Sequence, residues 1–231
     1  MTGITAVKIG GVLLENPDSA VSRILAVGAN RLAIVHGGGV QITRMLAKLN
    51  VKSEFIDGLR VTSEEALGAV SAALLGEVHT SLVMALQKAG IPAVGVFGAV
   101  RAENKSGPWG LVGTSVRANR DALLHIIEGG HVPVVPTLAI GDGTLLNVNG
   151  DETAAAVALA LSARRLVFLT DVEGVLDSDR AVIARVPREM SLQNASFVSG
   201  GMKPKLRAVE SALAGGVASV SVGRTVFGDP Q

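Results

Sequence analysis

Two kinds of hydrophobic pattern alternate along this chain. Short apolar blocks of four to six residues predict buried strands, and these blocks cover residues 4–9, 32–35, 93–96, 132–135, 166–169 and 219–222. Longer segments in which apolar residues recur every three or four positions predict helices, which cover residues 17–27, 40–49, 63–88, 119–128, 151–161 and the stretch after Gly201. This alternation predicts an α/β fold whose mostly parallel sheet is covered by helices on both faces.

Turn signals add detail to this outline. Ser63 is expected to cap the longest helix, and the run 141–143 (Gly-Asp-Gly) predicts the turn of a hairpin. Residues 98–116 have no clear period and are rich in glycine, which predicts an exposed hairpin or flap. An acidic turn is expected around residues 177–179. No linker divides the chain, and we expect any boundary between two lobes near residue 163, giving lobes 1–163 and 164–231.

The composition excludes several classes of protein. The chain has 231 residues, 48% of them apolar, and a net charge of +1 with only 3% aromatic residues, so nothing indicates a nucleic-acid surface. Cysteine is absent, which excludes disulfides, thiolate zinc sites and cysteine nucleophiles. The four histidines show no metal-ligand spacing. The N-terminus does not resemble a signal peptide and the apolar runs look too short to span a bilayer, so we expect a cytoplasmic protein.

Two lysines near opposite ends of the chain each lie beside a pair of glycines. Lys8 ends an apolar strand and is followed closely by Gly10 and Gly11, and Lys205 follows Gly200-Gly201 at the start of a helix. Glycine lets backbone N–H groups approach an anion, and a helix N-terminus favours negative charge. Two such cradles facing each other would suit a phosphoryl group in transfer, where catalysis consists mainly of positioning and charge neutralisation.

Polar residues also follow two other predicted strands. Gly37, Gly38 and Gly39 come directly after a strand, and three glycines in a row indicate close approach of a ligand, although a tight turn is the simpler alternative. Neither a Walker A loop nor a GxGxxG fingerprint occurs in the chain. In the run 146–151 (Leu-Asn-Val-Asn-Gly-Asp), alternation puts Asn147 and Asn149 on one side, and Asp151 is either a helix N-cap or part of a ligand site.

Two weaker signals complete the set. Arg60, in a short element marked by glycine, is a candidate for binding a carboxylate through two hydrogen bonds, although it could equally be a surface arginine. The run 170–176 follows a buried strand, and its place at the carboxyl end of that strand is compatible with nucleotide binding or with a simple turn.

Taken together, these segments resemble the amino acid kinase family. The resemblance is carried by residues 6–14, 34–39, 57–65, 131–135, 145–155, 168–176 and 199–206, which occur in the family's order and cover nearly the whole chain. The runs GLRVT (58–62) and NVNGD (147–151) are the most specific, and they are most similar to the branch of the family that acts on N-acetyl-L-glutamate.

The resemblance implies a three-layer αβα sandwich, with an amino-terminal lobe that binds the acyl amino acid and a carboxy-terminal lobe that binds ATP. It also implies the following site roles. Lys8 and Lys205 would neutralise the transferring phosphoryl group while Asp151 holds both ammonium groups. The other residues with implied roles are Gly37, Gly38, Arg60, Asn147 and Asn149 for the substrate, and Gly11, Asp171, Val172, Glu173, Gly174, Val175, Leu176, Phe197, Val198 and Ser199 for the nucleotide. No resident metal ion is implied, since Mg²⁺ would be bound through the phosphates of ATP.

The implied activity is ATP-dependent phosphorylation of the side-chain carboxylate of N-acetyl-L-glutamate, in arginine biosynthesis. A family member acting on carrier-protein-linked aminoadipate or glutamate is one alternative, and a catalytically silent sensor of amino acid or nucleotide is another. The chain shows no segment resembling the N-terminal helix of hexameric relatives, so the resemblance implies a homodimer. Neither a nucleic acid nor a membrane is an expected partner.

Overall fold

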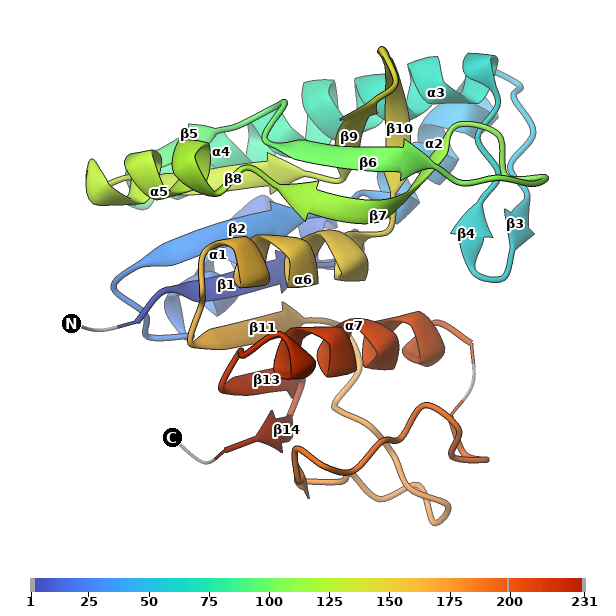
Figure 1. The fold of residues 1–231 in the computed structure, drawn as a ribbon. Helices are drawn as coiled ribbons and strands as arrows, with labels where there is room; N and C mark the ends of the chain where they lie inside the picture. The colour runs from blue at the N-terminus through green and yellow to red at the C-terminus, as the bar shows by residue number, and fades with distance from the viewer. Residues whose placement is uncertain (1–2, 199, 230–231) are drawn as a thin grey trace.

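An eight-stranded sheet forms the middle layer of the molecule in the computed structural model, which describes residues 3–198 and 200–229 (Figure 1). Every neighbouring pair in the sheet is parallel except β13 and β14. The strand order is β12 (Arg185–Val186), β14 (Thr225–Gly228), β13 (Ser219–Val222), β11 (Arg165–Leu169), β1 (Thr5–Ile9), β2 (Leu32–His36), β8 (Val132–Pro136) and β5 (Ala93–Gly95). The mostly parallel sheet expected from the sequence is confirmed.

Helices cover both faces of this sheet, which confirms the three-layer arrangement (Figure 1). Alternation along β1 shows how the faces divide, because Ala6 packs with one hydrophobic cluster while Val7 and Ile9 pack with another. The face of Ala6 carries α5 (Arg120–Glu128), α6 (Gly150–Ala160) and α7 (Met202–Ala214). The opposite face carries α1 (Pro17–Leu25), α2 (Gly39–Lys48) and the long helix that begins at Glu64. Lys8 therefore shares the α6 and α7 side of the sheet with Ala6.

The long helix contains a widened middle section that the sequence pattern did not predict. It runs through α3 (Glu64–Ser71), the π-helical segment η2 (Ala72–His79) and α4 (Thr80–Lys88), and the Ser63 side chain caps it by accepting from the N–H of Ala66 at 3.1 Å. By length and composition Glu64–Lys88 could cross a membrane, contrary to the expectation that no apolar run is long enough. Its buried residues, including Leu74 and Leu82, pack in the core of the protein, as in a core helix.

A small closed sheet of four strands lies beside the main sheet. It consists of β6 (Val100–Asn104), β7 (Val112–Ala118), β9 (Leu138–Gly141) and β10 (Thr144–Val148). The β9–β10 turn is made by Asp142 and Gly143, whose φ angles of 47° and 77° suit a tight hairpin. The β6–β7 hairpin occupies the predicted flap and runs two residues beyond it. One face of its strands is exposed, as expected, but closing the sheet buries Val100, Ala102 and Val112 on the other face.

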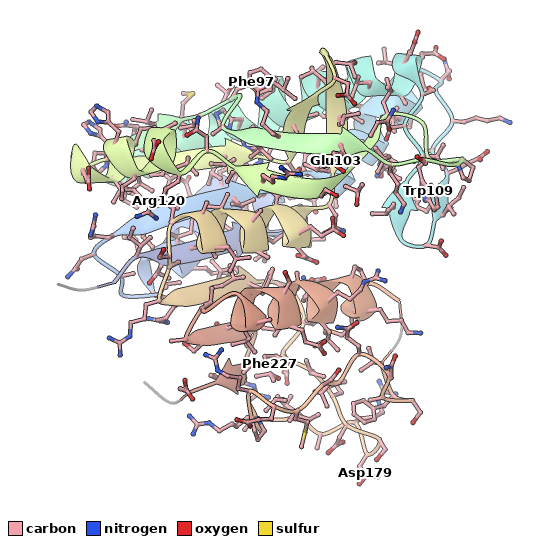
Figure 2. All side chains as sticks on the ribbon, in the orientation of Figure 1. Phe97, Glu103, Trp109, Arg120, Asp179 and Phe227 are labelled. Atoms are coloured by element: carbon pink, nitrogen blue, oxygen red, sulfur yellow. The ribbon has the colours of Figure 1, made fainter. Side chains whose placement is uncertain are left out.

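Only the tip of the β6–β7 hairpin projects, and it contacts a second small hairpin. The indole N–H of Trp109 donates to the carbonyl of Ile56 at 3.3 Å, which joins the tip to β3 (Phe55–Ile56) and β4 (Leu59–Arg60). Figure 2 shows Trp109 beside this hairpin. Of residues 98–116, Val112 lines the cleft that opens where strands β1, β2 and β10 end.

The carboxy-terminal region holds more strands than the pattern predicts. We expected the last strand at residues 219–222, but the chain turns after β13 and adds β14 antiparallel to it. The two-residue strand β12 then extends the sheet beyond β14. The predicted acidic turn is present, with the Asp177 carboxylate accepting from the N–H groups of Asp179 and Ala181 at 2.9 Å each.

Candidate active site

A cleft of about 460 Å³ opens where β1, β2 and β10 end and where α2 and α6 begin. Its position at the carboxyl ends of parallel strands is where open α/β sheets usually bind ligands. Sequence-predicted residues that line it are Lys8, Gly11, Gly37, Gly38, Arg60, Asn147 and Asn149. These residues come from segments more than 100 positions apart in the chain, and the fold brings them to one cavity.

Lys8 and Lys205 converge on one carboxylate at the edge of this cleft. The Nζ atom of Lys8 lies 2.9 Å from Oδ1 of Asp151, and the Nζ atom of Lys205 lies 3.0 Å and 3.1 Å from its two oxygens. Lys8 comes from β1, Asp151 from the first turn of α6 and Lys205 from the first turn of α7. The side chains are 14%, 9% and 11% exposed, so the ion triad is largely removed from water yet still reachable.

The triad carries two positive charges against one negative charge. Burial raises the pKa of Asp151, but the charges of Lys8 and Lys205 outweigh this effect and hold the pKa below its usual value, so the carboxylate stays ionised. Burial lowers the pKa of Lys205, Asp151 opposes this, and the net direction is down. The surplus positive charge in a dry site is suited to attracting an anion.

Asn149, and not Asp151, caps helix α6. Its Oδ1 accepts from the N–H groups of Asp151 at 2.8 Å and Glu152 at 3.1 Å. The reading of Asp151 as the N-cap is therefore wrong. Because Asn149 supplies the cap, the carboxylate of Asp151 is left to bind the two lysines.

The two glycine segments after β1 and β2 pack against each other. A Cβ atom on Gly11 would lie 2.7 Å from the backbone nitrogen of Gly39, so no larger residue fits there without moving the chain. A Cβ on Gly38 would lie 2.9 Å from a methyl group of Leu74 in the π-helical segment, whereas one on Gly37 would meet nothing within 4 Å. Close approach of two backbones therefore explains the glycine at position 11. The space beside Gly37 is open, so a ligand in the cleft could approach its backbone.

Arg60 is held in place by the carbonyl of Gly39 and by two hydroxyl groups that were not predicted, those of Thr43 and Ser53. One guanidinium nitrogen donates to the Thr43 hydroxyl at 2.8 Å and to the Gly39 carbonyl at 3.2 Å, and the other donates to the Ser53 hydroxyl. The ring of Phe55 lies 4.6 Å from the guanidinium carbon. Arg60 is 7% exposed and its burial lowers its pKa, so it is not an ordinary surface arginine.

Asn147, near the end of β10, also lines the cleft. Its amide donates to the Thr62 hydroxyl at 3.1 Å, and that hydroxyl donates to the carbonyl of Arg60 at 2.9 Å. These two hydrogen bonds fix the orientation of Asn147 relative to the hairpin that carries Arg60. Thr62 was not predicted, because its role depends on a contact across 85 positions of sequence.

A second cavity, of about 450 Å³, lies in the carboxy-terminal region. The predicted nucleotide residues that line it are Val172, Glu173, Gly174, Val175, Leu176, Phe197 and Val198, together with Arg180 and Met202. Asp171 is exposed and not part of the lining, although its charge acts on Lys205. Ser199, also predicted for this site, lies outside the described residues. Because Met202 is in the same first turn of α7 as Lys205, the helix joins this cavity to the ion triad.

Two buried polar side chains behind the glycine segments were also missed. Nε2 of His36 lies 2.8 Å from Nδ1 of His79. The pKa of His36 is lowered to about 3, mainly by its burial and to a smaller extent by the charge of His79. Gln41, in the first turn of α2, is 2% exposed. A polar residue at a core-facing position of an amphipathic helix is the only signal in the sequence that could have drawn attention to Gln41.

Comparisons with known proteins point to one family. The family model described as the amino acid kinase family matches residues 3–224. The acetylglutamate kinase of Solibacter usitatus is 42% identical over 230 residues, covering 94% of this chain and 89% of that protein. The acetylglutamate kinase of Rubrobacter xylanophilus is 43% identical over 221 residues, covering 91% and 85%.

Solved structures share the fold. The structure of smu.665 from Streptococcus mutans matches with a TM-score of 0.87 and 30% identity, covering 99% of both chains. Carbamate kinase from Giardia lamblia bound to AMP-PNP matches with a TM-score of 0.69 at 12% identity, again over 99% of both chains, and this likeness concerns the fold alone.

Proposed function

Because this chain belongs to the amino acid kinase family, we propose that it transfers the γ-phosphoryl group of ATP to the side-chain carboxylate of N-acetyl-L-glutamate. The product is N-acetyl-L-glutamyl 5-phosphate, an intermediate of arginine biosynthesis. The observation that carries this proposal is the convergence of Lys8 and Lys205 on Asp151 at a glycine-lined cleft, in a chain 43% identical to the acetylglutamate kinase of Rubrobacter xylanophilus. As a biosynthetic kinase of this kind, it would act in the cytoplasm.

The chemistry needs charge neutralisation more than proton transfer. The γ-carboxylate of the substrate is ionised at neutral pH, because its ordinary pKa is near 4.3. The nucleophile therefore needs no general base, but two anions must approach each other. Lys8 and Lys205 offset this repulsion and stabilise the charge on the equatorial oxygens of the transferring group. Asp151 orients both ammonium groups and does not abstract a proton.

Each wall of the cleft then has a role. The backbone N–H groups of Gly11, Gly37 and Gly38 donate to phosphoryl and substrate oxygens. Arg60 binds the α-carboxylate of acetylglutamate, because it is already held by Thr43 and Ser53 and loses little freedom on binding. Asn147 binds a neighbouring polar group of the substrate, and Asn149 supports it by fixing the start of α6.

ATP occupies the second cavity and extends its phosphates toward Lys205. The apolar side chains of Val172, Leu176 and Phe197 are suited to the adenine ring. Mg²⁺ bound with ATP would offset the negative charge of the phosphates, and the exposed carboxylate of Asp171 is an oxygen ligand of the kind that this ion accepts. In this proposal residues 1–163 form the acyl amino acid lobe and residues 164–231 the nucleotide lobe.

A homodimer is part of the proposal. Strand β5 is the last strand of the main sheet, and large apolar side chains are exposed beside it. Met84 is 67% exposed, Phe97 is 46% exposed and Val94 is 36% exposed. Figure 2 shows Phe97 at the surface of the molecule. A second copy of the chain placed against this edge would cover these side chains and the unpaired backbone groups of β5.

The two alternatives are less well supported. A silent sensor would not need two buried ammonium groups and a carboxylate arranged at hydrogen-bond distance. A kinase of carrier-linked substrates would need a basic surface near the β6–β7 hairpin. Of the basic residues there, Arg117 is paired with Glu103 at 2.7 Å and Lys105 lies over the Trp109 ring, and relatives of that kind usually lack the intact GLRVT run that this chain has.

An ATP-dependent hydroxamate assay tests the proposed function. N-acetyl-L-glutamate, N-acetyl-L-aspartate and aminoadipate are compared side by side at equal concentration. We expect rapid formation of acyl hydroxamate with acetylglutamate only. Faster turnover of either of the other two acids, or none with all three, would refute the proposed substrate.

A further inference from the structure

Gln41 carries a buried amide that contacts the glycine segment after β1, at Gly11. It is the third residue of α2 and is 2% exposed. Its Nε2 donates to the carbonyl oxygen of Gly11 at 3.0 Å, across 30 positions of sequence. It therefore links the start of α2, which follows β2, to the loop that follows β1.

Protein stability does not explain this amide. The Oε1 atom of Gln41 has no hydrogen-bond partner among the described residues, and a buried unpaired acceptor costs about 1–3 kcal/mol. The Gly11 carbonyl also accepts from the N–H of Leu14 at 3.2 Å, so it would remain paired without Gln41. An apolar side chain of similar shape would satisfy the fold at least as well, which indicates that the amide serves the site.

The hydrogen bond from Gln41 sets the orientation of one peptide unit. In a trans peptide the C=O of Gly11 and the N–H of Val12 point in opposite directions. With the Gly11 carbonyl drawn toward the buried amide, the Val12 N–H points away from it. Val12 lines the cleft, and its N–H has no backbone acceptor in the part of the chain that the structure describes.

We infer that Gln41 is a positioning residue that fixes the Gly11–Val12 peptide and so presents the Val12 N–H to the transferring phosphoryl group. This inference rests on the proposed kinase function. A donor that is fixed before the reaction stabilises developing charge without reorganising, whereas a peptide free to rotate must be ordered during the reaction.

The test replaces Gln41 by a residue of similar shape without the amide. For Gln41→Met we expect kcat for acetylglutamate to fall roughly 10- to 100-fold, less than the 10²–10³ typical of deleting a donor outright. KM values for ATP and acetylglutamate should change little, and the melting temperature should be unchanged or higher. The matched control is Gln87→Met, because the Gln87 amide also donates to a backbone carbonyl, that of Ala93 at 2.6 Å, beside the edge strand β5. The control should keep wild-type kcat.

Amide hydrogen exchange in the unliganded protein gives a readout that does not depend on activity. Residues 10–14 should exchange faster in Gln41→Met than in the wild type and in Gln87→Met. If Gln41→Met does not fold, Gln41→Leu replaces it, because leucine is apolar, fits the space of the glutamine and has no N–H to donate, and the same loss of kcat is expected.

The outcomes separate the two hypotheses. An inactive wild type would refute the proposed function itself. An active wild type with normal kcat in the folded Gln41 variant, or a kcat loss matched by a lower melting temperature, would refute the role of Gln41 and leave the kinase function standing.

Discussion

The ion triad shows how single residues divide the work of the site. Asp151 is held ionised by two lysines, and Asn149 relieves it of the capping role that its position would otherwise give it. The surplus positive charge that results is largely shielded from water, where each charge acts more strongly than at the surface.

Loss of either lysine should reduce turnover. For Lys8→Ala and Lys205→Ala we expect kcat to fall about 10²–10³-fold, or about 3–4 kcal/mol of transition-state stabilisation, while affinity for ATP changes less. Steady-state kinetics with acetylglutamate measures this. Lys88→Ala is the control, because Lys88 is 75% exposed and is paired with Asp18 at 3.5 Å, away from the cleft. Near-normal turnover in both active-site variants would rule out their assigned role.

His36 should make stability depend on pH. Its pKa is about 3 in the folded protein against 6.5 for an unperturbed histidine, so between these values the unfolded state binds more protons. The free energy of unfolding should therefore fall as the pH drops below 6.5, by up to about 1.4 kcal/mol per pH unit from this residue. Urea unfolding of the wild type and His36→Gln at pH 5, 6 and 7 measures the slopes. The variant should show the flatter slope, and parallel slopes would contradict the account.

At the scale of elements, the site is built where two strand-to-helix turns touch. The turn after β1 and the turn after β2 are so close that Gly11 has no room for a side chain. The π-helical segment packs behind the second turn through Leu74 and Val78. The geometry of the cleft therefore depends on packing between elements as much as on the residues that line it.

Alanine substitutions of Gly11 and Gly37, one in each turn, should differ in their effect on protein stability. Gly11→Ala should destabilise the protein by about 1–3 kcal/mol, because its Cβ would meet backbone at 2.7 Å and the two turns must separate. Gly37→Ala should keep wild-type stability, since nothing lies within 4 Å of its added carbon. Thermal or urea unfolding compares the two variants. Equal melting temperatures for both would show that the turns are not packed as described.

Much of the fold could be predicted from the sequence, because apolar residues recur with regular spacing in the strands and helices that form the core. Strands β12 and β14 were missed, because they are short and lie among turn residues. The π-helical segment was missed because a change in hydrogen-bond spacing leaves the apolar pattern of a helix nearly intact. The buried face of the flap was missed because the closure of β6 and β7 with β9 and β10 is a tertiary contact.

The candidate site was predictable in part for similar reasons. Lys8, Lys205 and Asp151 lie beside glycines at the ends of predicted elements, so local sequence pointed to them. Thr43, Ser53 and Thr62 escaped notice, because their contacts with Arg60 and Asn147 exist only after folding.

At the scale of the whole molecule, one continuous sheet connects the two proposed lobes. Strand β1 pairs with β2 on one side and with β11 on the other, so Lys8 lies on the strand between the two halves. Lys205 and Asp151 come from α7 and α6, which pack on the same face of that sheet. The fold thereby fixes the distance between the two ammonium groups.

The exposed apolar edge predicts the oligomeric state. Wild-type protein should have the mass of a dimer in light scattering, and Phe97→Asp combined with Met84→Glu should shift it to the mass of a monomer. Leu25→Glu is the control, because Leu25 is also exposed, at 53%, but lies on α1. A monomeric wild type, or a double variant that remains dimeric, would contradict the proposed interface.

A structure with ADP, Mg²⁺, tetrafluoroaluminate and acetylglutamate tests the central claim most directly, since the planar fluoride stands in for the phosphoryl group in transfer. We predict that it lies between the Nζ atoms of Lys8 and Lys205, each about 3 Å from a fluorine, with Asp151 still contacting both lysines. A fluoride bound away from either ammonium group, or acetylglutamate outside the cleft of Arg60 and Asn147, would contradict the account.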